Sequence, residues 1–245
     1  MGQHFLQDEN MCRKIVSQLQ HTPGMKLLEI GPGAGALTKY LIEWKDIDYK
    51  AIEVDNEKVL YLEKNYPQIK GKIILQDILK ADAPFEDVFN IIGNFPYNIS
   101  SPILFKVLDW EPIVNEVIGM FQKEVAQRIA APPGSKTYGI LSVLIQTFFK
   151  VEYLFDVHEN CFTPPPKVKS GVLQLTNLHN PFEIKDKRKF ITLVKTAFNQ
   201  RRKTLRNALK SILPAEMLSA EIMNKRAEQL SVADFVALYK QYNND

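Results

Sequence analysis

The chain of 245 residues has few cysteines and no long hydrophobic run. Its two cysteines, Cys12 and Cys161, are far apart and lack the spacing of metal ligands, so we expect reduced structural thiols and no metal site. No apolar run approaches the roughly 18 residues that a membrane span requires. The mixed, polar residues 1–10 also lack the pattern of a signal peptide. These absences argue against disulfide-rich, secreted and membrane proteins and predict a cytoplasmic protein.

A strong net charge is also missing, because 31 Lys+Arg nearly balance 28 Asp+Glu and leave +3 at pH 7. The distribution of charge is more informative than its total. Residues 181–245 hold 13 of the basic and 7 of the acidic residues, giving +6, so the rest of the chain carries −3. A basic tail on a nearly neutral body is typical of a protein that binds a polyanion such as nucleic acid.

Short apolar runs alternate with helical patterns over residues 1–180. This alternation predicts an α/β fold with a mostly parallel sheet and helices on both faces. We expect strands at residues 26–30, 48–53, 71–75, 88–93, 114–120, 151–157 and 171–176. Helices are expected at 8–19, 36–44, 56–65, 101–110, 122–130 and 139–150, and then, without further strands, at 186–198, 203–212, 216–223 and 232–242. We therefore predict an α/β domain at residues 1–180 and a small all-helical domain at residues 181–245.

A glycine-rich turn, residues 31–35, follows the first buried strand and precedes a helical pattern. Glycines such as Gly31 and Gly33 let the main chain approach a ligand closely. Glu53 stands at the end of the second predicted strand, where a carboxylate can accept both hydroxyls of a ribose. The pattern predicts a nucleoside-containing cofactor, and a dinucleotide stays possible because Gly31, Gly33 and Ala36 also fit that fingerprint.

Asp77 follows the third strand, where a carboxylate can accept a hydrogen bond from an adenine amino group. A solvated turn or a helix cap is the structural alternative for this residue. The glycine turn contains no Lys, Arg or Ser. Their absence favours a cofactor without a pyrophosphate, although main-chain amides alone can bind phosphate.

The fourth strand ends in Asn94-Phe95-Pro96-Tyr97, at the edge where open α/β sheets place their chemistry. These residues offer what an enzyme needs to methylate the amino group of adenine. That amino group is a poor nucleophile, because its lone pair is delocalised into the ring. The Asn94 side-chain oxygen and the Phe95 carbonyl can accept its two hydrogens and aim the lone pair at a methyl group. Pro96 stiffens the turn, and Tyr97 can stack on the purine. Such catalysis rests on positioning and needs no metal.

Phe162 begins a run that continues as Thr163-Pro164-Pro165-Pro166-Lys167. A proline run is stiff and extended, so it can hold Phe162 as the second wall of a base sandwich. Such walls offset part of the cost of removing a base from its stack. A plain loop between two edge strands is the alternative.

These motifs together resemble the small-subunit ribosomal RNA adenine dimethyltransferases, which dimethylate two adjacent adenines near the 3′ end of the small-subunit RNA. The similarity covers nearly the whole chain and rests on residues 2–6, 29–33, 94–100 and 162–168. It implies a Rossmann-like catalytic domain at residues 1–180, which binds S-adenosylmethionine, and a helical RNA-binding domain at residues 181–245. The implied cofactor contacts are His4, Leu6, Gly31, Gly33, Glu53, Asp77 and Asn94. Phe95 stands where the family often has leucine, which matters little if this position supplies a main-chain carbonyl.

The basic tail agrees with this resemblance. Arg201, Arg202, Lys203, Arg206 and Lys210 lie in or just before one predicted helix, and three of them recur every four residues and are expected on one face. With the resemblance, we expect them to contact RNA phosphates, which position the RNA and specify little sequence. A solvated surface helix is the alternative.

The resemblance implies 16S rRNA as the partner, within the small ribosomal subunit or its assembly precursor, and a monomer is the default. Three alternatives stay open from the sequence alone. The first is another adenine methyltransferase, which acts either on large-subunit RNA, as the antibiotic-resistance type does, or on DNA. The second is a dinucleotide-dependent oxidoreductase. The third is a nonenzymatic assembly factor that keeps the fold.

Overall fold

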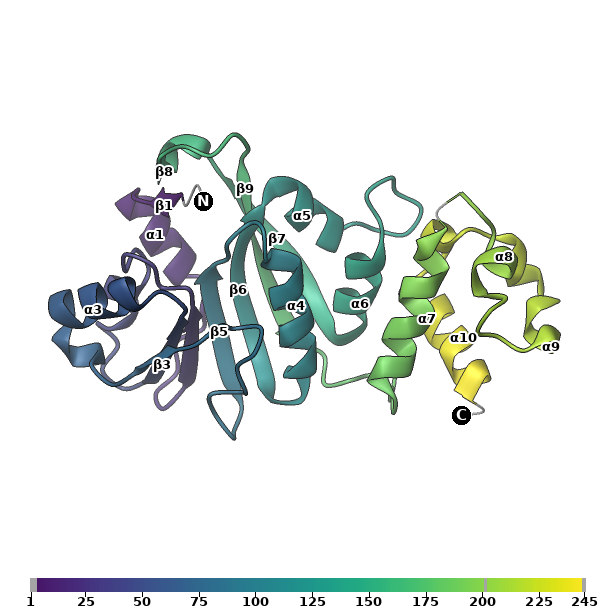
Figure 1. Cartoon of the computed structure of the whole chain (residues 1–245), viewed down its shortest axis with the longest axis horizontal. Helices are drawn as coiled ribbons and strands as arrows, with labels where there is room; N and C mark the ends of the chain where they lie inside the picture. The colour runs from purple at the N-terminus through teal and green to yellow at the C-terminus, as the bar shows by residue number, and fades with distance from the viewer. Residues whose placement is uncertain (1–3, 201, 244–245) are drawn as a thin grey trace. The chain divides into compact units, whose positions relative to one another are not determined.

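The fold is built on a seven-stranded sheet with the order β4-β3-β2-β5-β6-β9-β7 (Figure 1). The computed structural model describes residues 4–200 and 202–243. The neighbours from β4 to β6 are parallel, and β9 runs antiparallel to β6. The strands of this sheet are β2 (Lys26–Ile30), β3 (Asp48–Glu53), β4 (Ile73–Leu75), β5 (Phe89–Asn94), β6 (Val114–Gln122), β7 (Phe149–Val157) and β9 (Ser170–Asn177). A separate antiparallel pair joins β1 (Phe5–Leu6) to β8 (Phe162–Thr163).

Helices make up much of the remaining chain (Figure 1). They are α1 (Glu9–Val16), α2 (Thr38–Leu41), α3 (Asn56–Asn65), α4 (Ser100–Asp109), α5 (Lys123–Ile129), α6 (Ile140–Phe148), α7 (Lys187–Asn199), α8 (Leu205–Leu209), α9 (Ala215–Leu218) and α10 (Val232–Asn243). The predicted α/β class with a mostly parallel sheet is therefore confirmed. None of the helices among the described residues is long and apolar enough to cross a membrane.

The central strands are buried because their sequences are almost continuously apolar. In β5 the first five residues are buried, and in β6 seven of nine are buried. Strands covered on both faces have this composition, whereas half-exposed strands alternate. The predicted ranges of β2 and β3 agree with the structure to the residue, although three of the six residues of β3 are charged and its first residue is exposed.

Several predicted elements are shorter in the structure, and the reasons are clear for three of them. Strand β4 begins at Ile73, since Gly71 has a φ of 76°, which lies outside the strand region. Helix α2 covers only Thr38–Leu41, and the turns beside it have bonds over three residues, such as that from the Trp44 N–H to the Leu41 carbonyl at 3.2 Å. Helix α8 covers only Leu205–Leu209 of the predicted range 203–212, and this changes where the basic residues around it lie.

The chain forms two compact units. Residues 1–126 and 150–177 make up the first, and residues 127–149 and 178–245 make up the second. The second unit therefore includes α6, which the sequence pattern assigned to the α/β domain. The division into domains at residue 180 stays a prediction. The sequence pattern did not indicate that residues 127–149 belong to the second unit while residues 150–177 belong to the first.

The second unit has an aromatic core. Phe190 lies edge-on to both Phe148 and Tyr239, with ring centroids 6.3 and 5.6 Å apart, and Phe198 stacks on Phe235 at 5.8 Å. Helix α10 begins with the reciprocal cap that its sequence indicates. The Ser231 N–H donates to Asp234 Oδ2 at 2.8 Å, and the Asp234 N–H donates to Ser231 Oγ at 3.1 Å.

A buried carboxyl group ties together three elements of the first unit. Glu29, near the end of β2, is 2% exposed, and its Oε2 accepts from Thr38 Oγ1 of α2 at 2.8 Å and from Tyr49 Oη of β3 at 2.6 Å. Burial raises the pKa of Glu29 to about 7, although both hydroxyl donors lower it. The folded state therefore binds this proton more tightly than the unfolded chain does.

We predict that Glu29 makes stability fall as pH rises. Its pKa is raised from 4.5 to about 7 by folding. The stabilisation is thus complete below pH 4.5 and is lost as the pH rises to about 7, by about 3 kcal/mol. Glu29→Gln should remove this pH dependence, so that its stability relative to wild type increases between pH 5 and pH 8 in denaturant unfolding. The exposed Glu43→Gln should follow wild type; parallel curves for Glu29→Gln would contradict the assignment.

Candidate active site at the carboxyl edge of the sheet

The parallel strands bring most of the predicted site residues to one edge of the sheet. Strand β2 runs into Gly31, β3 ends at Glu53, β4 is followed by Asp77, and β5 ends at Asn94. These four strands are neighbours in the order β4-β3-β2-β5. Their carboxyl ends therefore form one continuous edge, which is where open α/β sheets bind ligands.

The glycine turn is shaped so that its main chain faces open space. Gly31 and Gly33 have φ values of 67° and 57°, a region that favours glycine. A Cβ atom at Gly31 would meet nothing within 4 Å, and one at Gly33 would meet only the Gly31 carbonyl at 3.9 Å. Gly35 differs, because a Cβ there would lie 2.7 Å from the Tyr66 ring. Gly31 and Gly33 thus line an open space, whereas Gly35 serves close packing.

The carboxylate of Glu53 joins this turn to the end of β3. Its Oε2 accepts from the Gly33 N–H at 3.1 Å, and its Oε1 accepts from the N–H groups of Val54 at 2.9 Å and Asp55 at 3.1 Å. Glu53 is only 5% exposed. A carboxylate has about four acceptor positions, and three are occupied here, so one remains for a hydroxyl of a ribose.

Apolar side chains stand beside the two acids at this edge. Val54 directly follows Glu53 and is 70% exposed. Leu75 is paired in register with Glu53 on the neighbouring strand and is 50% exposed. Half-buried Asp77 accepts from the Leu79 N–H at 3.0 Å through Oδ1. Exposed apolar groups next to an acceptor suit a purine ring with an amino group. Val54 and Leu75 were missed from the sequence, since an apolar residue ending a strand carries no signal of exposure.

Asn94 and Phe95 leave the sheet in different environments. Asn94 is half-buried at the last position of β5, whereas the Phe95 ring is fully buried and lies edge-on to Phe121 at 5.1 Å. Two glycines make room for that ring: a Cβ at Gly93 or Gly119 would lie 2.6 or 2.8 Å from Phe95 atoms. The side chain of Phe95 is thus a core group, which leaves its main chain for the site.

Tyr97 lies where segments from both ends of the first unit meet. Its hydroxyl is 2.6 Å from Ser170 Oγ at the start of β9, and its ring is 6.1 Å from the His4 ring at a tilt of 31°. His4 Nδ1 donates to the Pro164 carbonyl at 2.7 Å. Burial raises the pKa of the Tyr97 hydroxyl, so the group is neutral at physiological pH. Ser170 was missed, because it is far from Tyr97 in the sequence and no motif links the two.

Leu6 and Phe162 are paired in register between β1 and β8, and both are buried in the apolar core. Leu6 is 4% exposed and Phe162 is 2% exposed. The cofactor contact of Leu6 and the stacking role of Phe162 stay predictions. Phe162 would have to leave this core to act as the second wall of a base sandwich.

The predicted basic face needs a correction. Helix α8 covers only Leu205–Leu209, because Thr204 is extended with a ψ of 159°. Arg202 and Lys203 therefore precede the helix and Lys210 follows it, so Arg202, Arg206 and Lys210 do not share one face of a helix. All four described basic residues are nevertheless exposed, and Arg206 Nε donates to the Leu218 carbonyl at 3.1 Å. Arg201 lies outside the described residues.

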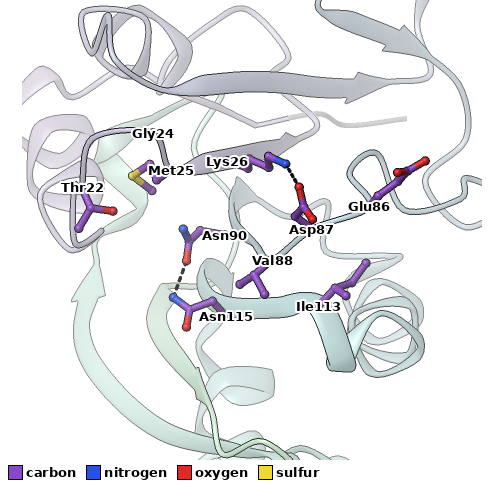
Figure 2. Close-up of a pocket in the computed structure, with 10 residues that line it drawn as sticks. All are labelled: Thr22, Gly24, Met25, Lys26, Glu86, Asp87, Val88, Asn90, Ile113 and Asn115. Carbon is purple, nitrogen blue, oxygen red and sulfur yellow. Dashed lines mark hydrogen bonds and ion pairs between the residues drawn. The ribbon is translucent and has the colours of Figure 1, made fainter.

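A wide hollow lies at the opposite, amino ends of the strands. It measures about 650 Å³ and is lined by the first residues of β2, β5 and β6 and the segments before them. Figure 2 shows that four of its polar side chains point toward one another in two pairs: Lys26 pairs with Asp87, and Asn115 Nδ2 donates to Asn90 Oδ1 at 2.9 Å. Its lining includes none of the described residues predicted for the site. Within residues 4–200 and 202–243, no cluster of three His, Cys, Asp or Glu side chains is placed to hold a metal.

Sequence comparison assigns a family to the whole chain. The sequence model of the family described as ribosomal RNA adenine dimethylase matches residues 1–244. A curated relative from Cytophaga hutchinsonii, named ribosomal RNA small subunit methyltransferase A, is 52% identical over 242 residues, which are 97% of this chain and 94% of the relative.

Solved structures agree with this similarity. A dimethyladenosine transferase from Plasmodium falciparum has a TM-score of 0.84 at 26% identity and covers 98% of both chains. The 23S rRNA methyltransferase ErmE has a TM-score of 0.69 at 22% identity, over 98% of this chain and 99% of that one, which shows the fold alone. TrmK of M. capricolum, solved with S-adenosylhomocysteine, has a TM-score of 0.50 at 13% identity over 96% of both chains, and it also shows the fold alone.

Proposed function

The chain belongs to the ribosomal RNA adenine dimethylase family and is an S-adenosylmethionine-dependent methyltransferase, and we propose that it dimethylates two adjacent adenines near the 3′ end of 16S rRNA. The observation that carries the proposal is the single sheet edge that joins an open glycine turn, a ribose acceptor and an amino-group acceptor, Asn94. The small-subunit substrate is favoured over large-subunit RNA because relatives of about half identity are named for the small subunit.

The carboxyl edge fits the methyl donor in chemistry as well as in place. Gly31 and Gly33 offer main chain without side chains, Glu53 offers an acceptor for the ribose, and Asp77 and the exposed Val54 offer an acceptor and an apolar surface for adenine. When bound, S-adenosylmethionine supplies an electrophilic methyl group on a sulfonium that leaves readily. The fit extends to charge, since no cationic side chain stands in the turn itself.

The residues at the end of β5 and directly after it hold the target base. The Asn94 side-chain oxygen and the Phe95 carbonyl accept the two hydrogens of the adenine amino group, and this fixes the nitrogen with its lone pair toward the methyl group. Tyr97 stacks on the ring and keeps it out of its RNA helix. Removing water and fixing the two reactants supplies the rate, so no general base of unusual pKa is needed.

The second unit binds the RNA backbone. Its exposed residues Arg202, Lys203, Arg206 and Lys210 cluster in the chain around one short helix. Phosphate contacts of this kind position an RNA without reading its sequence. We place the reaction in the cytoplasm, on the small subunit or its assembly precursor, with the enzyme as a monomer. An assembly role beside catalysis is compatible with this site, whereas hydride transfer has no use for Asn94 and Tyr97.

We predict that Asn94 is essential for transfer. Small ribosomal subunits from a strain that lacks this modification should accept label from S-adenosylmethionine as dimethyladenosine in 16S rRNA. Asn94→Ala should reduce kcat by a hundredfold or more, because one acceptor for the amino group is lost, while affinity for the subunit persists. Full activity in Asn94→Ala would refute the assigned role. Label in the 23S rRNA of large subunits assayed in parallel, with none in the 16S rRNA of the small subunits, would refute the assigned substrate.

We also predict that Arg202 and Arg206 contact phosphates. Replacing both with Ala should weaken RNA binding. The negative slope of log affinity against log salt should become shallower by about 1.5, as expected for two lost phosphate contacts. Cofactor affinity should not change. The matched control is a double Ala variant of Lys45 and Lys70, two exposed cations of the first unit. Equal salt slopes for wild type and the Arg202/Arg206 variant would exclude the contacts.

A further inference from the structure

The hydroxyl of Tyr97 is held by a residue outside the motif that contains it. Ser170 Oγ lies 2.6 Å from the Tyr97 Oη, and the serine is completely buried. Tyr97 itself is half-buried, in the turn between β5 and α4. A hydrogen bond this short, shielded by burial on one side, restricts the movement of the tip of the aromatic side chain more than a bond to solvent would.

Ser170 is well suited to hold another side chain still, because its own main chain is fixed twice. It is the first residue of β9 and is paired in register with Gln122 of β6. The residue before it, Lys169, accepts from the Lys123 N–H through its carbonyl at 2.9 Å. The position therefore belongs to the rigid sheet and not to the proline run that precedes it.

The other end of Tyr97 is fixed as well. Ser100 Oγ donates to the Tyr97 main-chain carbonyl at 3.1 Å, and the His4 ring lies 6.1 Å from the Tyr97 ring. Ser100 thus holds the main chain and Ser170 the tip of the side chain. What remains adjustable between them is the direction of the ring's long axis, which ends at the hydroxyl, and the bond to Ser170 sets that direction.

We propose that Ser170 is a positioning residue that orients the Tyr97 ring, and through it the plane of the target adenine. The inference rests on the proposed function, in which Tyr97 stacks on the base. A stacked base takes the tilt of its partner ring, and its amino nitrogen then points along a fixed line. Methyl transfer needs that line to meet the carbon, so a small error in tilt reduces the rate more than it reduces binding.

The bond can be removed from either side. Ser170→Ala and Tyr97→Phe each should lower kcat about tenfold on small subunits, with the KM for the subunit and the affinity for S-adenosylhomocysteine within twofold of wild type. The double variant should be no slower than either single one, because both changes remove the same bond. Ser170→Thr keeps the hydroxyl and should restore most of the rate. Ser142→Ala removes a fully buried serine hydroxyl of the second unit and serves as the matched control.

The outcomes separate this inference from the proposed function. Wild-type kcat in Ser170→Ala and Tyr97→Phe, or effects that multiply in the double variant, would overturn the positioning role. Tyr97→Ala tests the stacking itself: if its kcat is reduced while Tyr97→Phe is fully active, the ring matters and its bond to Ser170 does not. If Tyr97→Ala is fully active too, the stacking role of Tyr97 is wrong. A fall in melting temperature for Ser170→Ala, with kcat unchanged, would assign Ser170 to stability alone.

Discussion

The carboxylate of Glu53 is the contact on which the rest of the site depends. It accepts three main-chain N–H groups, one from the glycine turn after β2 and two from the segment after β3. Bonds to a charged acceptor are stronger than neutral ones, and at 5% exposure water competes little for them. Glu53 therefore fixes the distance between two strand ends. One step further into the sheet, Glu29 does the same for β2, α2 and β3.

Core packing and chemistry are coupled at the next strand end. The ring of Phe95 fills space that Gly93 and Gly119 leave open, so the core itself decides where the chain turns toward Asn94 and Tyr97. A residue that looks like part of an aromatic active site thus packs as an anchor in the core, which leaves its main chain for the role proposed above.

The parts of this structure that could be predicted are those governed by local pattern. Strand β2 follows from its apolar run, and Gly31, Glu53, Asp77 and Asn94 meet at one edge because parallel strands share their direction. What could not be predicted depends on contacts across long stretches of chain. Ser170 meets Tyr97 from a distant strand, Phe162 turns into the core because β8 pairs with β1, and the extended Thr204 delays the start of α8, so that Arg202 and Arg206 do not share a helical face.

The central claim is that the carboxyl edge, and not the hollow at the amino ends, holds the cofactor. Calorimetric titration with S-adenosylhomocysteine tests it most directly in Glu53→Gln and Glu86→Gln, since Glu86 lines the hollow of Figure 2. Loss of a charged hydrogen bond predicts a tenfold to hundredfold weaker Kd, roughly, for Glu53→Gln and an unchanged Kd for Glu86→Gln. Wild-type affinity in Glu53→Gln with weakened binding in Glu86→Gln would contradict the account.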